Sequence, residues 1–181
     1  MKRIILLLLV ALVLPMTACS DKEEQINNEP IPYFVLERYL GTWYEIARYD
    51  HKFERDLENV IAEYSLQEND KVRVLNSGRK DGKLETAEGV AIQPQPNTNP
   101  AQLRVSFFMF FYSDYRILYI DSDYEYALVG SKSEDYLWLL SRKPQLTEDQ
   151  KSILLMEAHN RGYDTSNLIW VNQSANIRSF K

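Results

Sequence analysis

The central part of the chain alternates between short runs of β-forming residues and polar turns, and this alternation limits the fold more than any other feature. Turn-forming residues such as Asp81 and Gly82 separate the runs. Runs of this length with a two-residue period are typical of antiparallel strands. Eight such strands in succession predict an all-β fold, either an up-and-down barrel without exposed edges or a sandwich. The runs cover residues 42–50, 60–67, 71–76, 84–92, 103–108, 115–120, 126–131 and 136–141.

The period of the sequence changes after the eighth run. Thr147 and Gln150 have the spacing of a capping box, in which each side chain satisfies a free backbone N–H of the first helical turn. Apolar residues follow at 153, 154 and 156–158, and Gly162 is suited to end a helix. The sequence therefore predicts one C-terminal helix, followed by a short strand at 167–173. The roughly 150 residues that contain these elements suit a single domain.

The N-terminal residues predict export from the cell. Lys2 and Arg3 precede an unbroken apolar run at 4–14, which is too short as a helix to cross a hydrocarbon core of about 30 Å. We interpret 1–18 as a signal peptide and not as a membrane span. The segment 14–19, which ends in Ala18-Cys19, resembles the lipobox of bacterial lipoproteins. This resemblance implies that Cys19 is acylated, whereas the alternative is an ordinary cleaved signal followed by a free thiol.

Cys19 is the one cysteine of the sequence, so the exported chain forms no internal disulfide. The polar residues 19–32 contain too little apolar surface to pack and predict a lipidated, disordered tether. It leads to a folded domain at 33–175 and a C-terminal tail at 176–181. Ser20 stands where an aspartate would retain an enterobacterial lipoprotein in the inner membrane. By resemblance, this residue points to a periplasm-facing anchor in the outer membrane.

The charge of the chain excludes one class of partner. Removing residues 1–18 removes two basic residues, which leaves 19 basic against 26 acidic residues and a net charge of −7. A nucleic-acid partner would require a concentrated basic face, which this composition does not provide.

Three residues carry a resemblance to a known family. Gly41 and Trp43 open the first strand run, and Arg142 ends the eighth, in register to stack its guanidinium on the Trp43 indole. This pattern resembles the motif at the closed end of a lipocalin barrel. The segments 44–55, 121–129 and 169–171 resemble the bacterial lipoprotein branch of that family. The resemblance covers 36–173 and implies an eight-stranded antiparallel up-and-down barrel with a C-terminal helix, which binds a small apolar ligand without transforming it.

Strand parity then indicates which side chains line the barrel. Side chains alternate between the two faces of a strand, and a slip of one residue would invert every assignment. The lining would suit a ligand with one polar group and an apolar tail, with phenol hydroxyls near the mouth. The residues predicted to bind ligand are Val105, Phe107, Tyr115, Ile117, Tyr136 and Trp138.

The aromatic segment 107–112 has too many rings for all of them to point into a barrel. In one interpretation the outer rings pack beneath the helix or a loop. In the other, which we favour as a hypothesis, they form an apolar rim at the mouth for lipid uptake or contact with a bilayer.

The sequence offers little for catalysis or metal binding. His51 and His159 lie far apart, no Cys/His pattern has zinc spacing, and no Gly-rich phosphate loop is present. We therefore predict no catalytic residue, no metal and no cofactor. Glu45 is expected inside the barrel, where an ion pair with Arg142 would explain it.

The predicted function is that of a membrane-anchored lipocalin, a monomer or homodimer that stores or transports fatty acids or lysophospholipids in the bacterial envelope. Two alternatives stay open. One is a structural envelope lipoprotein whose barrel is filled by its own side chains. The other is a tetrapyrrole-binding lipocalin, for which His51 would be the strand-borne candidate ligand.

Overall fold

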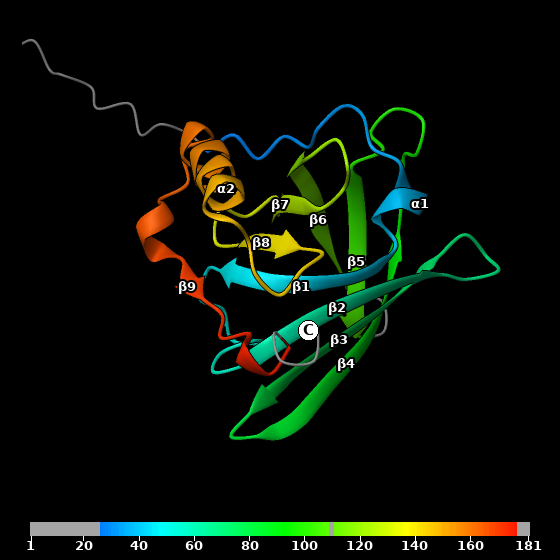
Figure 1. The fold of residues 1–181 in the computed structure, drawn as a ribbon. Helices are drawn as coiled ribbons and strands as arrows, with labels where there is room; N and C mark the ends of the chain where they lie inside the picture. Colours follow the sequence, from blue (N-terminus) through cyan, green and yellow to red (C-terminus); the bar gives the residue numbers. More distant parts are fainter. Residues whose placement is uncertain (1–25, 109–110, 177–181) are drawn as a thin grey trace, which may run out of the picture.

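The computed structural model describes residues 26–108 and 111–176, which form a β-barrel with a helix on its outside (Figure 1). The predicted signal peptide, Cys19, Ser20 and residues 177–181 of the tail lie outside the described residues. In chain order the elements are α1 (Leu36–Tyr39), β1 (Gly41–Arg48), β2 (Glu58–Leu66), β3 (Val72–Lys80), β4 (Lys83–Ile92), β5 (Gln102–Phe108), β6 (Phe111–Ile120), β7 (Tyr126–Gly130), β8 (Leu137–Ser141), α2 (Glu148–Asn160), the 3₁₀ helix η1 (Thr165–Asn167) and β9 (Ile169–Trp170).

Within the described residues, eight antiparallel strands close into a barrel. Each strand pairs with the next in sequence, and β1 pairs with both β2 and β8. Because the barrel is closed, neither β1 nor β8 has a free edge. In a sandwich, both of these end strands would have one. The predicted up-and-down barrel is therefore confirmed. The short β9 adds to the end of β1, opposite Ala47 and Arg48.

Several strands differ in length from the prediction. β3 continues through Ser77 and Gly78 to Lys80. A side chain at Gly78 would contact Val60 and the backbone of Glu58, so this glycine permits close packing and does not form a turn. The turn follows at Asp81 and Gly82, both with positive φ, as a tight two-residue hairpin requires. β6 begins at Phe111, earlier than predicted, whereas the predicted strand at 167–173 shrinks to β9.

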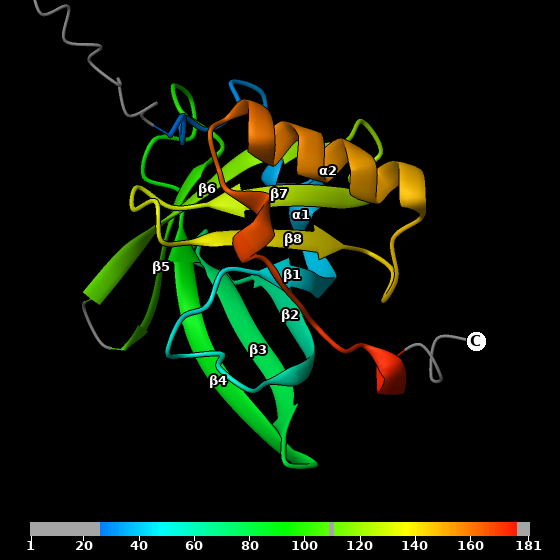
Figure 2. The same cartoon turned by 90° about the vertical axis from the view of Figure 1, so that its left-hand side faces the viewer.

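The up-and-down connectivity gives the barrel two different ends. The β1–β2, β3–β4, β5–β6 and β7–β8 connections lie at one end, which we call the mouth. The β2–β3, β4–β5 and β6–β7 connections and α1 lie at the opposite end, which we call the floor. Figure 2 shows the β1–β2 and β7–β8 connections on its left-hand side, together with the end of β5 and the start of β6.

The C-terminal helix α2 packs against the outer face of the barrel (Figure 2). The predicted capping box is present: the Gln150 N–H donates to the Thr147 side chain, and the Thr147 N–H donates to the Gln150 side chain. Leu154 and Ala158 are fully buried against β6, β7 and β8, whereas Met156 of the predicted apolar stripe is exposed. Gly162 has φ +89°, and it follows the helix as predicted.

The end of the predicted tether is packed and not disordered. Residues 26–32 run along the barrel, where the Asn27 N–H donates to the Arg161 carbonyl at 2.8 Å and the Ile31 N–H donates to the Ile117 carbonyl at 2.9 Å. Arg116 Nη1 also donates to Asn28 Oδ1 at 2.8 Å. These polar residues are held by hydrogen bonds to the barrel, a possibility that their low apolar content did not indicate. Among helices of the described residues, none is both long and apolar enough to span a membrane.

Candidate functional site: the barrel interior

Trp43 closes the floor of the barrel. Its ring is fully buried, and its Nε1 donates to the Tyr39 carbonyl at 2.8 Å. The Arg142 guanidinium carbon lies 3.9 Å from the centre of the Trp43 ring, which is the stack that the sequence predicts. Gly41 has φ +96°, and a Cβ there would lie 3.4 Å from Arg142 Nη1. Glycine thus permits both the backbone turn into β1 and the close approach of the guanidinium.

Arg142 also joins three chain segments at the floor. Nη1 donates to the Thr42 carbonyl at 2.8 Å, Nη2 to the Arg38 carbonyl at 2.8 Å and Nε to the Tyr124 carbonyl at 3.1 Å. Its partial burial lowers the pKa of the guanidinium, but arginine remains charged in proteins. Because these partners come from α1, β1 and the β6–β7 turn, Arg142 fixes the floor rather than binding a ligand.

Three tyrosines form a hydrogen-bonded cluster just above Trp43. The Tyr115 hydroxyl lies 2.6 Å from that of Tyr39 and 2.9 Å from that of Tyr64. Burial raises the pKa of Tyr39 and Tyr115 well above 10.0 and that of Tyr64 to about 12. The sequence predicts phenol hydroxyls near the mouth, but the Tyr115 hydroxyl faces Tyr39, whose ring lies 4.8 Å from Trp43. The phenols satisfy one another near the floor.

Aliphatic side chains make up most of the rest of the inner cluster. Of the predicted lining residues, Val105 and Ile117 are buried in the inner cluster with Trp43, and Tyr115 and Trp138 pack against it. The strand parity assigned from the sequence therefore places these four side chains inside. They share the inner cluster with Val72, Val74, Ala91, Leu103, Val129 and Leu140.

Phe107 and Tyr136, the other two predicted lining residues, lie nearer the mouth. A β-bulge interrupts β5 between Val105 and Phe108, and Phe107 is 44% exposed and lies outside the inner cluster. Its ring covers Gly89, where a Cβ would lie 2.8 Å from Phe107 Cδ1. Tyr136 precedes β8 and stacks on Trp138 with ring centres 5.7 Å apart. The interior therefore changes from closely packed at the floor to partly exposed aromatic at the mouth.

A second bulge, in β1, places two charged side chains inside the barrel. The register shifts between Glu45, opposite Leu140, and Ala47, opposite Leu139, so that Arg48 comes opposite Trp138 on the inner face. Arg48 Nη1 donates to Glu45 Oε1 at 2.7 Å, and both residues are almost fully buried. The sequence predicted Arg142 as the partner of Glu45, and that prediction is wrong. Arg142 uses its donors on backbone carbonyls, and the bulge brings Arg48 to Glu45.

The β1–β2 connection folds over this ion pair from the mouth. Glu54 accepts from Trp138 Nε1 at 3.1 Å, His51 Nε2 lies 2.8 Å from Glu54 Oε2, and Arg48 Nη2 donates to the Glu54 carbonyl at 2.5 Å. We call Glu45, Arg48, His51, Glu54 and Trp138 the polar cluster. Neither the bulge nor the fold of this connection has a sequence signature, so the cluster could not be predicted.

Burial and pairing act in opposite directions on the two carboxylates of the polar cluster. Desolvation, aided by the nearby Glu54 carboxylate, raises the pKa of Glu45 well above 4.5. Desolvation also opposes ionisation of Glu54, but bonds from His51 and Trp138 and the charge of Arg48 outweigh it and lower its pKa. The pKa values of the two carboxylates therefore move apart, that of Glu54 near the mouth downward and that of Glu45 deeper in the wall upward.

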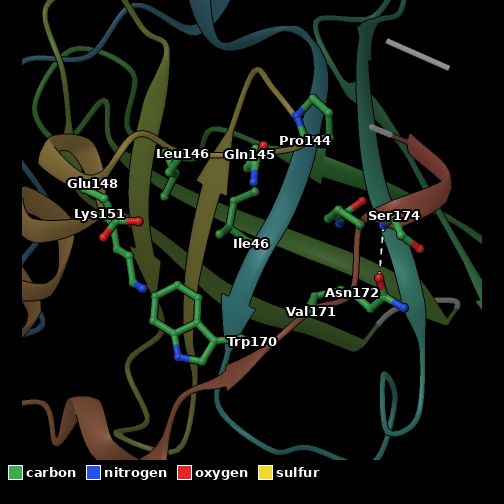
Figure 3. A pocket seen from close by; sticks show the side chains of 11 residues that line it. Ile46, Pro144, Gln145, Leu146, Glu148, Lys151, Trp170, Val171, Asn172 and Ser174 are labelled. Carbon is green, nitrogen blue, oxygen red and sulfur yellow. Dashed lines mark hydrogen bonds between the residues drawn. The ribbon is translucent and has the colours of Figure 1, made fainter. Parts of the chain in front are cut away.

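Little in the described residues outside the polar cluster indicates chemistry. No group of three or more His, Cys, Asp and Glu side chains within that part of the chain is placed to hold a metal ion. A groove of about 340 Å³ lies outside the barrel, between β1, the loop before α2 and the C-terminal segment (Figure 3). Trp170 lines it, with Lys151 Nζ 4.4 Å from the centre of its ring. The groove is open and of mixed polarity, so we take the barrel interior as the candidate site.

Comparison with known proteins gives a consistent result. A model of the lipocalin-like domain matches residues 34–173. The outer membrane lipoprotein Blc of Escherichia coli is 42% identical over 158 residues, which cover 86% of this chain and 89% of the relative. The outer membrane lipoprotein Blc of Vibrio cholerae is 38% identical over 174 residues, with 94% and 99% covered. The structure of insecticyanin from the tobacco hornworm superposes with a TM-score of 0.69 at 22% identity, over 83% of this chain and 87% of that one.

Proposed function

The chain belongs to the lipocalin family, and from that premise we propose that it binds fatty acids or lysophospholipids inside its barrel. In this proposal it is anchored to the bacterial outer membrane through acylated Cys19, faces the periplasm, and stores or transports its ligand without transforming it. Its partners are the lipid and the membrane, and it acts as a monomer or homodimer.

The amphipathic interior is the observation that carries the proposal. Aliphatic side chains such as Val105, Ile117 and Val129 line the wall, and an acyl chain is recognised by apolar surface of this kind. The polar cluster lies on the same wall toward the mouth, where Arg48 Nε has no hydrogen-bond partner among the described residues and can face a carboxylate or phosphate group. A molecule with an apolar tail and one polar group matches this order.

The anchor is supported by the N-terminal sequence and by the relatives. Relatives at 38–42% identity are named outer membrane lipoproteins. The match to the Vibrio cholerae relative covers 94% of the chain, so it extends into the N-terminal residues that the structure does not describe. An acyl anchor at Cys19 would hold the barrel beside a supply of lipid, and several acyl chains would make the attachment stable.

The contacts of His51 and of the polar cluster bear on two alternatives, a tetrapyrrole-binding protein and an enzyme. A tetrapyrrole ligand would need a free histidine, but His51 Nε2 faces Glu54 and the ring contacts both Tyr136 and Trp138. Catalysis would need an activated group at the site, whereas the charged side chains of the polar cluster are paired with one another, Arg48 with Glu45 and His51 with Glu54. A barrel filled by its own side chains is distinguished by experiment.

Displacement of a fluorescent fatty acid tests the proposal. Val105→Phe adds volume to the wall, where Val105 is 9% exposed, and should weaken binding at least tenfold while circular dichroism shows a folded barrel. Val35→Phe makes the same substitution at an exposed position near the floor and is the matched control. If the unsubstituted protein does not bind the probe, or if both variants bind it equally well, the ligand does not occupy the barrel.

A further inference from the structure

The mouth of the barrel exposes large aromatic side chains. Phe53 in the β1–β2 connection is 84% exposed, and Phe108 and Phe111, which flank the β5–β6 connection, are 72% and 78% exposed. We call these three residues the mouth rim. They do not pack beneath α2, which was one interpretation of the segment 107–112, because the cluster under α2 is formed by other residues. Exposed aromatics gathered at one end of a molecule indicate an interaction surface.

The described chain begins at the same end as the mouth rim. Asn28 Nδ2 donates to the carbonyl of Lys132, which lies in the β7–β8 connection at the mouth, and Asn27 is bonded to Arg161 beyond the end of α2. Figure 2 shows this first described segment, in dark blue, on the side of the β7–β8 connection. The chain from Cys19 therefore reaches the barrel close to its mouth.

The chain between Cys19 and Ile26 limits how the barrel can be oriented. Seven residue steps span at most roughly 25 Å even when extended. The strands are about as long as that, since the seven steps of an eight-residue strand such as β1 rise about 23 Å. To present its floor to the membrane that holds Cys19, the barrel would have to use the whole of this length along its own side. If the mouth faces the membrane, the chain between Cys19 and Ile26 does not have to extend along the side of the barrel.

The charges near the mouth rim favour apolar over electrostatic contact. Arg55 pairs with Asp50 at 2.5 Å and Lys80 pairs with Asp56 at 3.2 Å, so two of the basic side chains near the β1–β2 connection are already paired with carboxylates. The folded domain also carries excess negative charge and would not adhere to an anionic bilayer by charge alone. Contact with the bilayer therefore depends on burial of aromatic rings at its interface.

We propose that the mouth of the barrel docks on the bilayer that holds the anchor, with Phe53, Phe108 and Phe111 buried in its interface. In this orientation the ligand site opens directly to the membrane, and lipid passes between the two without crossing water. The inference rests on the proposed function only for the anchor at Cys19 and for the ligand that is exchanged.

The acylated chain offers a simple labelling experiment, because acylation consumes the thiol of its one cysteine. Phe111→Cys then carries the single free thiol, which is labelled with an environment-sensitive fluorophore in the full lipidated protein. Leu66→Cys, at an exposed apolar position (51%) at the floor end, is the matched control. The protein is reconstituted in phosphatidylethanolamine/phosphatidylglycerol vesicles that contain a spin-labelled lipid quencher.

The proposal expects strong quenching at position 111, little at position 66, and no loss of quenching at high salt. Equal quenching at both positions, quenching at position 66 alone, or quenching at neither position would overturn it. Bound lipid is measured by mass spectrometry on the same samples. Absence of lipid with a quenched mouth rim would refute the proposed function and not the docking, whereas bound lipid with an unquenched mouth rim would refute the docking alone.

A kinetic measurement adds a functional readout. Phe108→Ser with Phe111→Ser should slow transfer of a fluorescent fatty acid from vesicles about tenfold, because less apolar surface is buried on docking. Leu66→Ser should leave the transfer rate unchanged. Equal rates for the two variants would contradict the proposal.

Discussion

Replacement of Arg142 by alanine should destabilise the barrel more than any other arginine substitution at its surface. The guanidinium makes three hydrogen bonds to carbonyls of α1, β1 and the β6–β7 turn and stacks on Trp43 at 3.9 Å. Hydrogen bonds from a charged donor contribute about 1.5 kcal/mol or more each, and a shielded cation–π contact contributes about 1–2 kcal/mol. Because solvent reaches part of the side chain and such contributions are not additive, we expect a loss of about 3–5 kcal/mol.

Urea denaturation followed by circular dichroism measures this loss, and a shift of roughly 10 °C in Tm should accompany it. Arg142→Lys is an informative second variant. A lysine keeps the charge but can neither make the three bonds in this geometry nor stack as a plane, so it should recover less than half of the loss.

Arg73→Ala is the control, because Arg73 is an exposed strand arginine that pairs with Glu88 at 2.6 Å. Water and salt screen an exposed pair of this kind, so its loss should change stability little. If Arg142→Ala were no more destabilising than Arg73→Ala, or if Arg142→Lys were as stable as the unsubstituted protein, Arg142 would not fix the floor.

Three further predictions concern the interior and its cover. Arg48→Met should lower the free energy of unfolding by about 3 kcal/mol at pH 8 and by less at pH 5, where Glu45 can bind a proton; equal losses in urea denaturation at both pH values would contradict this. Because the pKa of Tyr64 is raised to about 12 and those of Tyr39 and Tyr115 also lie above 10.0, the unfolded chain ionises first. Their contribution to stability should be complete below pH 10 and lost as the pH rises toward 12, and phenolate absorbance equivalent to all twelve tyrosines near pH 10 before any unfolding would be the contrary result. Gly130→Ala should destabilise the protein by about 1–3 kcal/mol in the same assay, since its Cβ would lie 2.8 Å from Leu118 Cδ1 under α2, while Gly82→Ala in the open β3–β4 turn tests backbone strain alone.

The features that the sequence predicted correctly are those set by local patterns. The two-residue period identified all eight barrel strands, and the capping box at Thr147 identified the start of α2. The pairing of Arg142 with Trp43 followed from a family motif. The four inner lining residues followed from strand parity in stretches where no bulge intervenes.

The features that the sequence did not predict depend on irregular backbone. The bulge in β1 reverses the parity after Glu45 and so brings Arg48 inside, and the bulge in β5 leaves Phe107 at the mouth. His51 and Glu54 reach the interior through a connection whose course depends on tertiary contacts. The residues 26–32 are held by Arg116 and Arg161, which are far from them in the sequence.

Native mass spectrometry of the full lipidated protein, extracted gently from membranes, tests the central claim most directly. The account predicts one fatty acid or lysophospholipid bound to each chain, retained by the unsubstituted protein and lost from Val105→Phe. A folded protein that carries no lipid and takes none up from vesicles would contradict it, and would indicate a barrel filled by its own side chains.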